Sequence, residues 1–350
     1  MTKQSTVAGR LDELDYLRGF ALMGILLLNV IGLLHIPEPM PGTSDEVYQK
    51  ALYMFGEARF FSIFSFLFGI GFYLFISRAN AKGRNGYLLF LARVVLLFLM
   101  GLAHMIFHPG EALAVYAVCG LLLLPFYKVK RWINVLGGFL LLIAACVMGI
   151  KGIMPLSLIW LGIAAGQYEV MDWVKSRPRA FAWIAAASIP LAVIALIYQY
   201  SLAPDGPFSY FVLDGTGDAV FEQGNAFIKA GLLIAPVVTF SYMCVLLLLL
   251  RLKTFRVLLD PMRAMGRMAL TNYVMQTVFV LAAGHLLDWT GTIGLWSTLP
   301  LCLAILAIQM TYSSLWLRYF TMGPLEWSWR ALTYFKLPPF LKKGRASAET

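Results

Sequence analysis

The stretch LDYLRGFALMGILLLN, residues 14–29, begins the first long apolar segment of this 350-residue chain. It carries Asp15 and Arg18 at its start and Asn29 well inside the apolar run. Eleven residues separate Arg18 from Asn29, which in a helix is three turns plus about 20°, or about 16 Å along the axis. The two side chains therefore share one stripe of a predicted helix. Such a stripe either lines a ligand site or serves as an interfacial anchor and a helix–helix contact.

The composition indicates a membrane protein. Hydrophobic residues make up 60% of the chain and charged residues 13%, whereas soluble globular domains contain about 45–50% apolar and about 25% charged residues. A helix crosses a bilayer with roughly 20 mostly apolar residues. We therefore predict an all-α transmembrane bundle in one integral membrane domain, residues 1–317, with about ten spans at 18–36, 60–77, 86–107, 112–127, 132–150, 154–168, 180–200, 226–250, 268–287 and 293–317.

The distribution of lysine and arginine predicts the orientation of the bundle. If both termini are cytoplasmic, 24 of the 28 Lys and Arg residues lie in cytoplasmic segments, as the positive-inside rule requires. Loops 37–59 and 201–225 are then extracytoplasmic, and residues 318–350 form a cytoplasmic tail with an interfacial helix. The net charge of +10 thus follows from topology, and no nucleic-acid partner is expected.

A second polar cluster lies in GLAHMIFHPGEALAVYAVCG, residues 101–120. His104 is near the end of one predicted helix, Glu111 is in the first turn of the next, and Tyr116 is five residues deeper. His35 lies near the same predicted outer side. A histidine, a carboxylate and a tyrosine that converge are sufficient for general acid–base catalysis. The alternative is a capped turn with an interfacial histidine.

A third polar cluster lies in RAMGRMALTNYVMQT, residues 263–277. Arg263 and Arg267 precede a predicted helix, and Asn272 and Gln276, four residues apart, share one face of it. This pattern suits an anionic ligand, such as a phosphate, that arrives from the cytoplasm. The alternative is that these side chains only join helices.

The closing motif GPLEWSWRALTYF, residues 323–335, contains Glu326 and Arg330 as an i,i+4 pair. We expect an interfacial amphipathic helix here, from which Arg330 adds to the cytoplasmic anion site. No Walker loop, dinucleotide fingerprint or Cys/His metal spacing is present in the sequence. The four cysteines lie in apolar runs without paired spacing. We therefore expect no metal site and no tightly bound cofactor.

These motifs, with FFSIFSFLFGIGFYLF at residues 60–75, resemble the YeiB-type family of polytopic bacterial inner-membrane proteins, and they occur in the family's order. The resemblance implies a location in the bacterial inner membrane. It also implies kinship with membrane acyltransferases, including the heparan glucosaminide acetyltransferases. Those enzymes move an acyl group from cytoplasmic acyl-CoA to an acceptor on the other side of the membrane.

The first helix is also similar to that of the type-three membrane acyltransferases, which carry an arginine, ten residues and then a catalytic histidine. Arg18 matches this arginine, and Asn29 stands at the histidine position. An asparagine side chain cannot accept a proton as a base. The resemblance therefore requires another base, either His104 oriented by Glu111 or else His35, or it implies that the chain does not catalyse.

Three classes of function agree with these patterns. The first is an acyltransferase-like enzyme that takes acyl-CoA as co-substrate and transfers the acyl group to an extracytoplasmic hydroxyl or amine. The second is a transporter or channel for a small metabolite or ion. The third is a non-catalytic membrane assembly partner. Membrane lipids surround the protein in all three cases, and an oligomer is compatible with each.

Overall fold

The computed structural model describes residues 11–208 and 219–342. Parts of the predicted loop 201–225 and of the predicted tail 318–350, namely residues 209–218 and 343–350, lie outside the described residues. Within them the regular elements are helices, and the pairing of Phe320 with Leu341 is an isolated bridge. The all-α class is therefore confirmed.

The α-helices are α1 (Asp12–Leu33), α2 (Ser44–Phe55), α3 (Phe60–Ala81), α4 (Gly86–Met105), α5 (Leu113–Leu123), α6 (Arg131–Met148), α7 (Met154–Gln167), α8 (Val170–Ser176), α9 (Pro178–Tyr200), α10 (Ala219–Leu249), α11 (Lys253–Leu258), α12 (Asp260–Arg267), α13 (Ala269–Leu286), α14 (Thr298–Tyr319) and α15 (Pro324–Tyr334). Short 3-10 helices follow α5, precede α7 and precede α14.

Seven helices in the described part of the chain are long and apolar enough to cross a membrane, or up to eight if α7 and α8, which are bent by 55°, form one span. A helix satisfies its own backbone hydrogen bonds, which is why such apolar runs fold this way in lipid. The predicted spans 112–127, 154–168 and 268–287 fall on α5, α7 and α13, which are shorter or more polar than the seven. The chain is a multi-pass membrane protein, and the count of ten spans stays a prediction.

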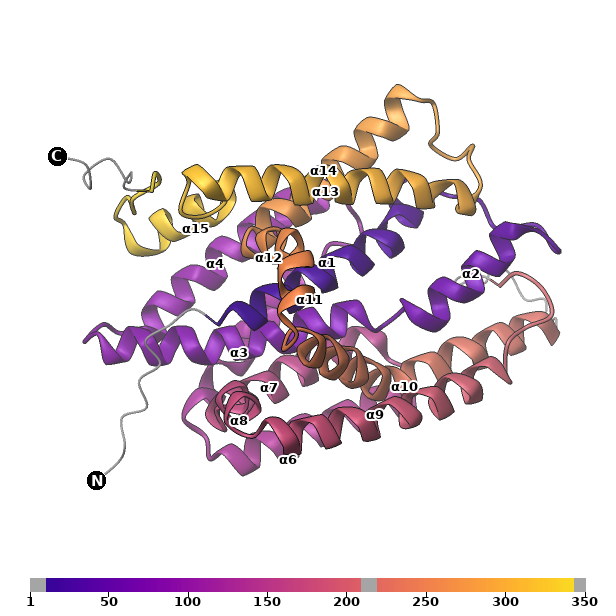
Figure 1. Cartoon of the computed structure of the whole chain (residues 1–350). Coiled ribbons are helices and arrows are strands. Elements are labelled where there is room, and N and C mark those ends of the chain that lie inside the picture. Colours follow the sequence, from indigo (N-terminus) through magenta and orange to yellow (C-terminus); the bar gives the residue numbers. More distant parts are fainter. Residues whose placement is uncertain (1–10, 209–218, 343–350) are drawn as a thin grey trace.

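The helices are arranged around α1 and α3, which contact each other. Figure 1 shows α6 to α10 on one side of this pair and α12 to α15 on the other. Helix α3 packs against α7, and α10 packs against α9, while α12 packs against α1 and α14. The two groups of helices, α6 to α10 and α12 to α15, therefore meet along α1 and α3.

Helix α1 and helix α12 touch through their backbones at two glycines. A Cβ atom on Gly19 would lie 2.1 Å from the Met262 carbonyl oxygen, and one on Gly266 would lie 1.9 Å from the Asp15 carbonyl oxygen. A larger residue at either position would push the helices apart. This contact brings together the chain neighbours of the two glycines, Arg18 and Arg267.

Helix α15 folds back after α14 and packs against α4 and α13. Pro324 occupies its first turn, where a proline needs no hydrogen-bond donor. The returning helix therefore forms a wall beside the end of α3 and the start of α4, where the cavity described below lies.

Candidate functional site

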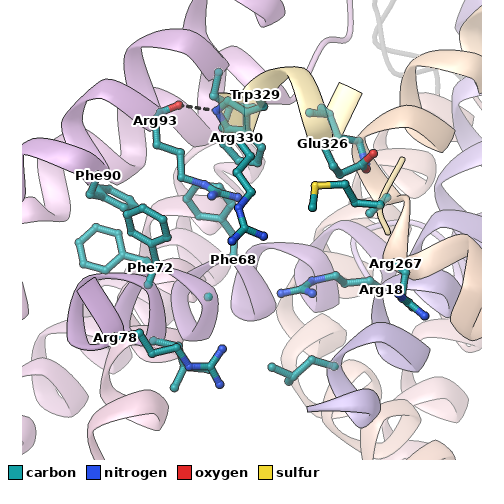
Figure 2. Close-up of a pocket in the computed structure, with 18 of the residues that line it drawn as sticks. Arg18, Phe68, Phe72, Arg78, Phe90, Arg93, Arg267, Glu326, Trp329 and Arg330 are labelled. Carbon is teal, nitrogen blue, oxygen red and sulfur yellow. Dashed lines mark hydrogen bonds between the residues drawn. The ribbon is translucent and has the colours of Figure 1, made fainter. Parts of the chain in front are cut away.

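A cavity of about 1090 Å³ lies between α1, α3, α4, α13 and α15 (Figure 2). Its α3 wall runs from Phe64 to Lys82, which is about 27 Å of helix. Arg78 and Lys82 line one end of this wall, and Phe64 and Phe68 line the other. The shape suits a long ligand with an anionic head and an apolar tail.

Basic side chains dominate one end of the cavity, which we call the basic end. Eight of them, counted among the described residues, are Arg18, Arg78, Lys82, Arg84, Arg93, Arg267, Arg330 and Lys336. Figure 2 shows Arg18, Arg78, Arg93, Arg267 and Arg330 around one space. The acidic lining residues are Asp15, whose Oδ1 lies 3.1 Å from Arg18 Nη1, and Glu326. The excess of positive charge attracts a polyanion.

Arg93 is fixed in the wall by aromatic rings. Its guanidinium carbon lies 3.6 Å from the ring centroid of Trp329 and 4.9 Å from that of Phe75, so it makes cation–π contacts on α15 and α3. The Trp329 indole Nε1 donates a 2.9 Å hydrogen bond to the Arg93 carbonyl oxygen, drawn as a dashed line in Figure 2. These contacts hold α15 against α4.

Glu326 holds α15 against the start of α13. Its Oε1 accepts hydrogen bonds from the backbone N–H groups of Leu270 (2.7 Å) and Thr271 (3.1 Å), and its Oε2 accepts one from Thr271 Oγ1 (2.6 Å). The first N–H groups of a helix have no partner within the helix, so this carboxylate caps α13. Burial raises the pKa of the Glu326 carboxyl, and these hydrogen bonds partly oppose that rise.

Aromatic rings line the opposite end of the cavity, the aromatic end. Phe64 and Phe68 stack on Tyr116 with ring centroids 5.9 and 5.7 Å apart. Phe72 and Phe90, edge-on to each other at 4.2 Å, lie nearer the basic end, beside Arg93 and Arg78 in Figure 2. Such walls bury apolar ligand surface and disfavour exposed charge.

A buried histidine–carboxylate pair lies next to the aromatic end. His104 Nδ1 is 3.1 Å from Glu111 Oε1, and His104 Nε2 is 3.0 Å from Thr277 Oγ1. Glu111 Oε2 accepts a 2.9 Å hydrogen bond from the Ala114 N–H in the first turn of α5. His104 and Glu111 are 7% and 4% exposed. The carboxylate orients the imidazole as in other histidine–carboxylate pairs.

Tyr273 connects the cavity with this pair. It lines the cavity, whereas His104 and Glu111 are not among the lining residues. The Tyr273 ring lies edge-on to His104 at 5.3 Å, and its hydroxyl oxygen accepts a 3.3 Å hydrogen bond from the Ala112 N–H. A group bound at the aromatic end therefore meets Tyr273 before it meets His104.

The structure brings together part of the set that the sequence suggested. The predicted binding residues that line the cavity are Arg18, Tyr116, Arg267 and Arg330. The predicted catalytic residues His104 and Glu111 contact each other. His104 itself does not line the cavity, where the side chain of Tyr273 forms the wall.

Arg263, the other arginine of the predicted anion-binding cluster, does not line the cavity with Arg18 and Arg267. Its Nη1 is 2.9 Å from Asp12 Oδ2 and its Nη2 is 2.6 Å from Asp260 Oδ1. The turn of α12 that brings Arg267 to the cavity directs Arg263 toward the start of α1, where it pairs with these two acids.

Asn272 and Gln276 join helices. This is the alternative to an anion site that the sequence analysis gave for these two residues. Asn272 Nδ2 donates to the Ser313 hydroxyl oxygen at 2.9 Å, and Gln276 Nε2 donates to the Leu22 carbonyl oxygen at 3.1 Å. Neither residue lines the cavity. Asn29 and His35 do not line it either, and His35 is exposed with a left-handed φ of 49° just after α1.

The sequence reading missed four contributors: Arg78, Arg93, Tyr273 and Trp329. Arg93 carried a usable signal, because an arginine inside the apolar run of residues 88–100 is costly in lipid and is usually functional. Tyr273 and Trp329 depend on where α13 and α15 fold, which no local pattern reveals.

Two family models match the chain. The model for heparan-alpha-glucosaminide N-acetyltransferase, catalytic, matches residues 10–207, and the model described as protein of unknown function (DUF418) matches residues 165–336. The first covers α1 to α9, and the second covers the end of α7 and α8 to α15, so the cavity takes walls from both. No solved structure matches the chain.

Curated relatives extend over nearly the whole chain. A 39.9 kDa protein encoded beside an amylase gene in Bacillus acidopullulyticus is 46% identical over 96% of this chain and 97% of its own length. YxaH of Bacillus subtilis is 29% identical over 96% and 97%, and YeiB of Escherichia coli is 26% identical over 94% and 98%.

Fold and site thus define an all-helical, multi-pass membrane protein with a cation-lined cavity that ends near a buried histidine–carboxylate pair. The chain belongs to the YeiB-type family, which is distantly related to the heparan glucosaminide acetyltransferases. The family resemblance of the sequence motifs is therefore confirmed.

Proposed function

We propose that this protein is a membrane acyltransferase that moves an acyl group from acyl-CoA to a hydroxyl or amine acceptor. The observation that carries the proposal is the cavity, which has eight basic side chains at one end and aromatic rings at the other. CoA has the matching shape, with phosphates at one end and a thioester at the other. The match to the acetyltransferase family model agrees with this reaction class.

The basic end holds the phosphates of CoA through charge-assisted hydrogen bonds from Arg18, Arg267 and Arg330. The aromatic end holds the pantetheine arm and the acyl group beside Tyr116. No cofactor stays bound between turnovers, because acyl-CoA enters and CoA leaves as co-substrate and product.

His104 acts as the base that takes the proton of the acceptor. If Nδ1 carries the proton and donates it to the Glu111 carboxylate, Nε2 remains an acceptor, and the Thr277 hydroxyl donates to it. An unprotonated Nε2 is the form that a base requires. The acceptor displaces Thr277 at this nitrogen when it binds.

The topology that suits this reaction has about ten spans with both termini in the cytoplasm of a bacterium. The basic end then opens to cytoplasmic acyl-CoA, and loops 37–59 and 201–225 face the acceptor side of the inner membrane. The charge distribution of the sequence supports this orientation. Accessibility labelling of single cysteines placed in the two loops and in residues 318–350 tests it.

The test uses the purified full-length protein in lipid nanodiscs. CoA binding is measured by calorimetry, and transfer is measured from radiolabelled acetyl-CoA to glucosamine, the class of amine that the name of the matching family suggests. We expect CoA to bind, and we expect His104→Ala to abolish transfer without weakening CoA binding. The matched control is His285→Ala, because His285 is an exposed histidine at the end of α13.

Two results would overturn the proposal. One is wild-type protein that does not bind CoA, and the other is His104→Ala protein with wild-type turnover. Anion uptake into proteoliposomes without acyl transfer would instead favour a transporter.

A further inference from the structure

Tyr273 occupies a position that the acyl transfer described above leaves without a role. It lines the aromatic end of the cavity, and its ring lies edge-on to that of His104, with the two centroids 5.3 Å apart. It is 6% exposed, and its hydroxyl oxygen accepts the Ala112 N–H at 3.3 Å. The Tyr273 hydroxyl would therefore lie between a thioester bound at the aromatic end and His104, the proposed base.

Thioester cleavage in this cavity faces a charge problem. When the acceptor attacks the carbonyl carbon, the new C–N or C–O bond forms, the C–S bond breaks, and sulfur leaves with the electron pair. The thiolate appears among aromatic walls, where a negative charge is poorly solvated. A proton delivered to sulfur as the bond breaks removes this charge, which is general acid catalysis.

The pair itself is poorly placed to deliver that proton. In the proposed transfer His104 Nε2 already takes the proton of the acceptor, its Nδ1 is held by Glu111, and Tyr273 forms the cavity wall in front of the pair. Tyr116, the other phenol at this end, donates its hydroxyl proton to the Phe61 carbonyl oxygen at 3.3 Å and accepts from Ser65 at 3.1 Å. Its proton is thus directed away from the pair.

We propose that Tyr273 is the catalytic acid that protonates the leaving CoA thiolate. This inference rests on the acyl transfer proposed above and adds a residue to it. The acceptor proton passes to His104, Tyr273 gives its proton to sulfur, and the His104–Glu111 pair returns a proton to the phenolate. The products are the acylated acceptor and the CoA thiol, and no net proton is gained or lost.

The test compares two thioesters that differ in their need for a proton. Acetyl-CoA releases an alkyl thiolate, which needs protonation, whereas acetyl 4-nitrothiophenol releases a stabilised aryl thiolate, which does not. Tyr273→Phe keeps the ring and removes only the hydroxyl. We expect this variant to lose about 100-fold in turnover of acetyl-CoA and less than about threefold in turnover of the aryl thioester.

Controls separate this role from a structural one. CoA affinity should be unchanged in Tyr273→Phe, and Tyr198→Phe, at an exposed tyrosine of α9, should match wild type with both thioesters. An equal loss with both thioesters, or no loss with either, overturns the assignment to Tyr273 while acyl transfer itself stands. Wild-type protein that transfers from neither thioester refutes the proposed function and this inference together.

Discussion

Arg59 and the arginines at the basic end of the cavity have opposite surroundings. Arg59, at the start of α3, is 0% exposed, and its guanidinium donates to the carbonyl oxygens of Glu57 and Gly231 and to Gln199 Oε1. The arginines at the basic end of the cavity surround a space large enough for a ligand. A fully buried guanidinium such as that of Arg59 is costly in a membrane bundle without partners.

The difference teaches how to separate a structural arginine from a binding one. At Arg59 the partners come from α9, α10 and the preceding turn, so this side chain joins three segments and has little left to offer a ligand. At the basic end like charges gather around a shared space, which costs energy until an anion binds. Substitution should therefore lower stability at Arg59 and lower ligand affinity in the cavity.

Replacement of Arg59 should give the largest effect on stability. Arg59→Leu leaves the Gly231 carbonyl and the Gln199 amide oxygen buried without their donor, and each such group costs about 1–3 kcal/mol. We expect a loss of roughly 3 kcal/mol or more in the free energy of unfolding, measured by denaturant titration in one detergent. Arg59→Lys should recover part of the loss. An unchanged unfolding midpoint in Arg59→Leu would erase the distinction drawn between the two groups.

Replacement of a cavity arginine should act on binding instead. Arg267→Gln and Arg330→Gln each remove one charge-assisted contact, so we expect CoA to bind about tenfold more weakly in each, with no loss of stability. Affinity should also depend less on salt than in wild type. The control is Arg179→Gln, at an exposed arginine of α9. Unchanged CoA affinity in both cavity variants would mean that the basic end binds something else.

Replacement of Gln276 tests the distinction between structural and ligand-binding residues with a neutral side chain. Gln276 Nε2 donates to the Leu22 carbonyl oxygen at 3.1 Å and to Gln309 Oε1 at 3.2 Å, linking α13 to α1 and α14. Gln276→Leu should cost about 1 kcal/mol of stability and leave CoA affinity at the wild-type value. A double-mutant cycle with Gln309→Leu measures the coupling of the two amides. Weaker CoA binding in Gln276→Leu would place this residue with the cavity arginines after all.

The sequence predicted the helices well because hydropathy is a local property. Each of the ten predicted spans falls on a helix, including 268–287 on α13, whose polar residues keep it outside the seven clear spans. The same local patterns could not show which of the two arginines, Arg18 or Arg263, lines the cavity. Both lie at the polar start of an apolar run, and only the packing of α1 on α12 directs one into the cavity and pairs the other with Asp12.

The sequence could predict the histidine–carboxylate pair of the candidate site, but it could not predict the residues that form the cavity walls. His104 and Glu111 lie seven residues apart on two sides of one turn, so their pairing could be expected from the sequence. Tyr273 comes from a helix more than 150 residues later, and Trp329 from a helix that folds back on α4. Contacts between residues so far apart in the sequence depend on how the whole bundle packs, so no local motif predicts them.

Replacement of Glu326 should have the smallest effect on stability. This residue bears on the comparison of structural and binding residues because it is an acid that lines the cavity. It caps α13 through its hydrogen bonds to Leu270 and Thr271, and the sign of its pKa shift tests whether it also neutralises the arginines. Burial raises the pKa of this carboxyl above its ordinary value of 4.5, so the folded protein binds the proton more tightly than the unfolded chain does. Its contribution to the free energy of unfolding is then greatest at low pH and declines as pH rises through the raised pKa.

The Glu326→Gln variant removes this titration and keeps an oxygen that can accept from the Leu270 and Thr271 N–H groups. We expect the Tm of wild type minus that of Glu326→Gln to fall by a few degrees as the pH is raised from 4.5 to neutrality, and to stay level above the raised pKa. A carboxylate held by the arginines would have a lowered pKa, and its Tm difference would be lost only as the pH falls below the ordinary value. A Tm difference that rises with pH would therefore assign Glu326 to the charge balance of the cavity, and one that falls shows that burial outweighs any charge of the arginines at this carboxyl.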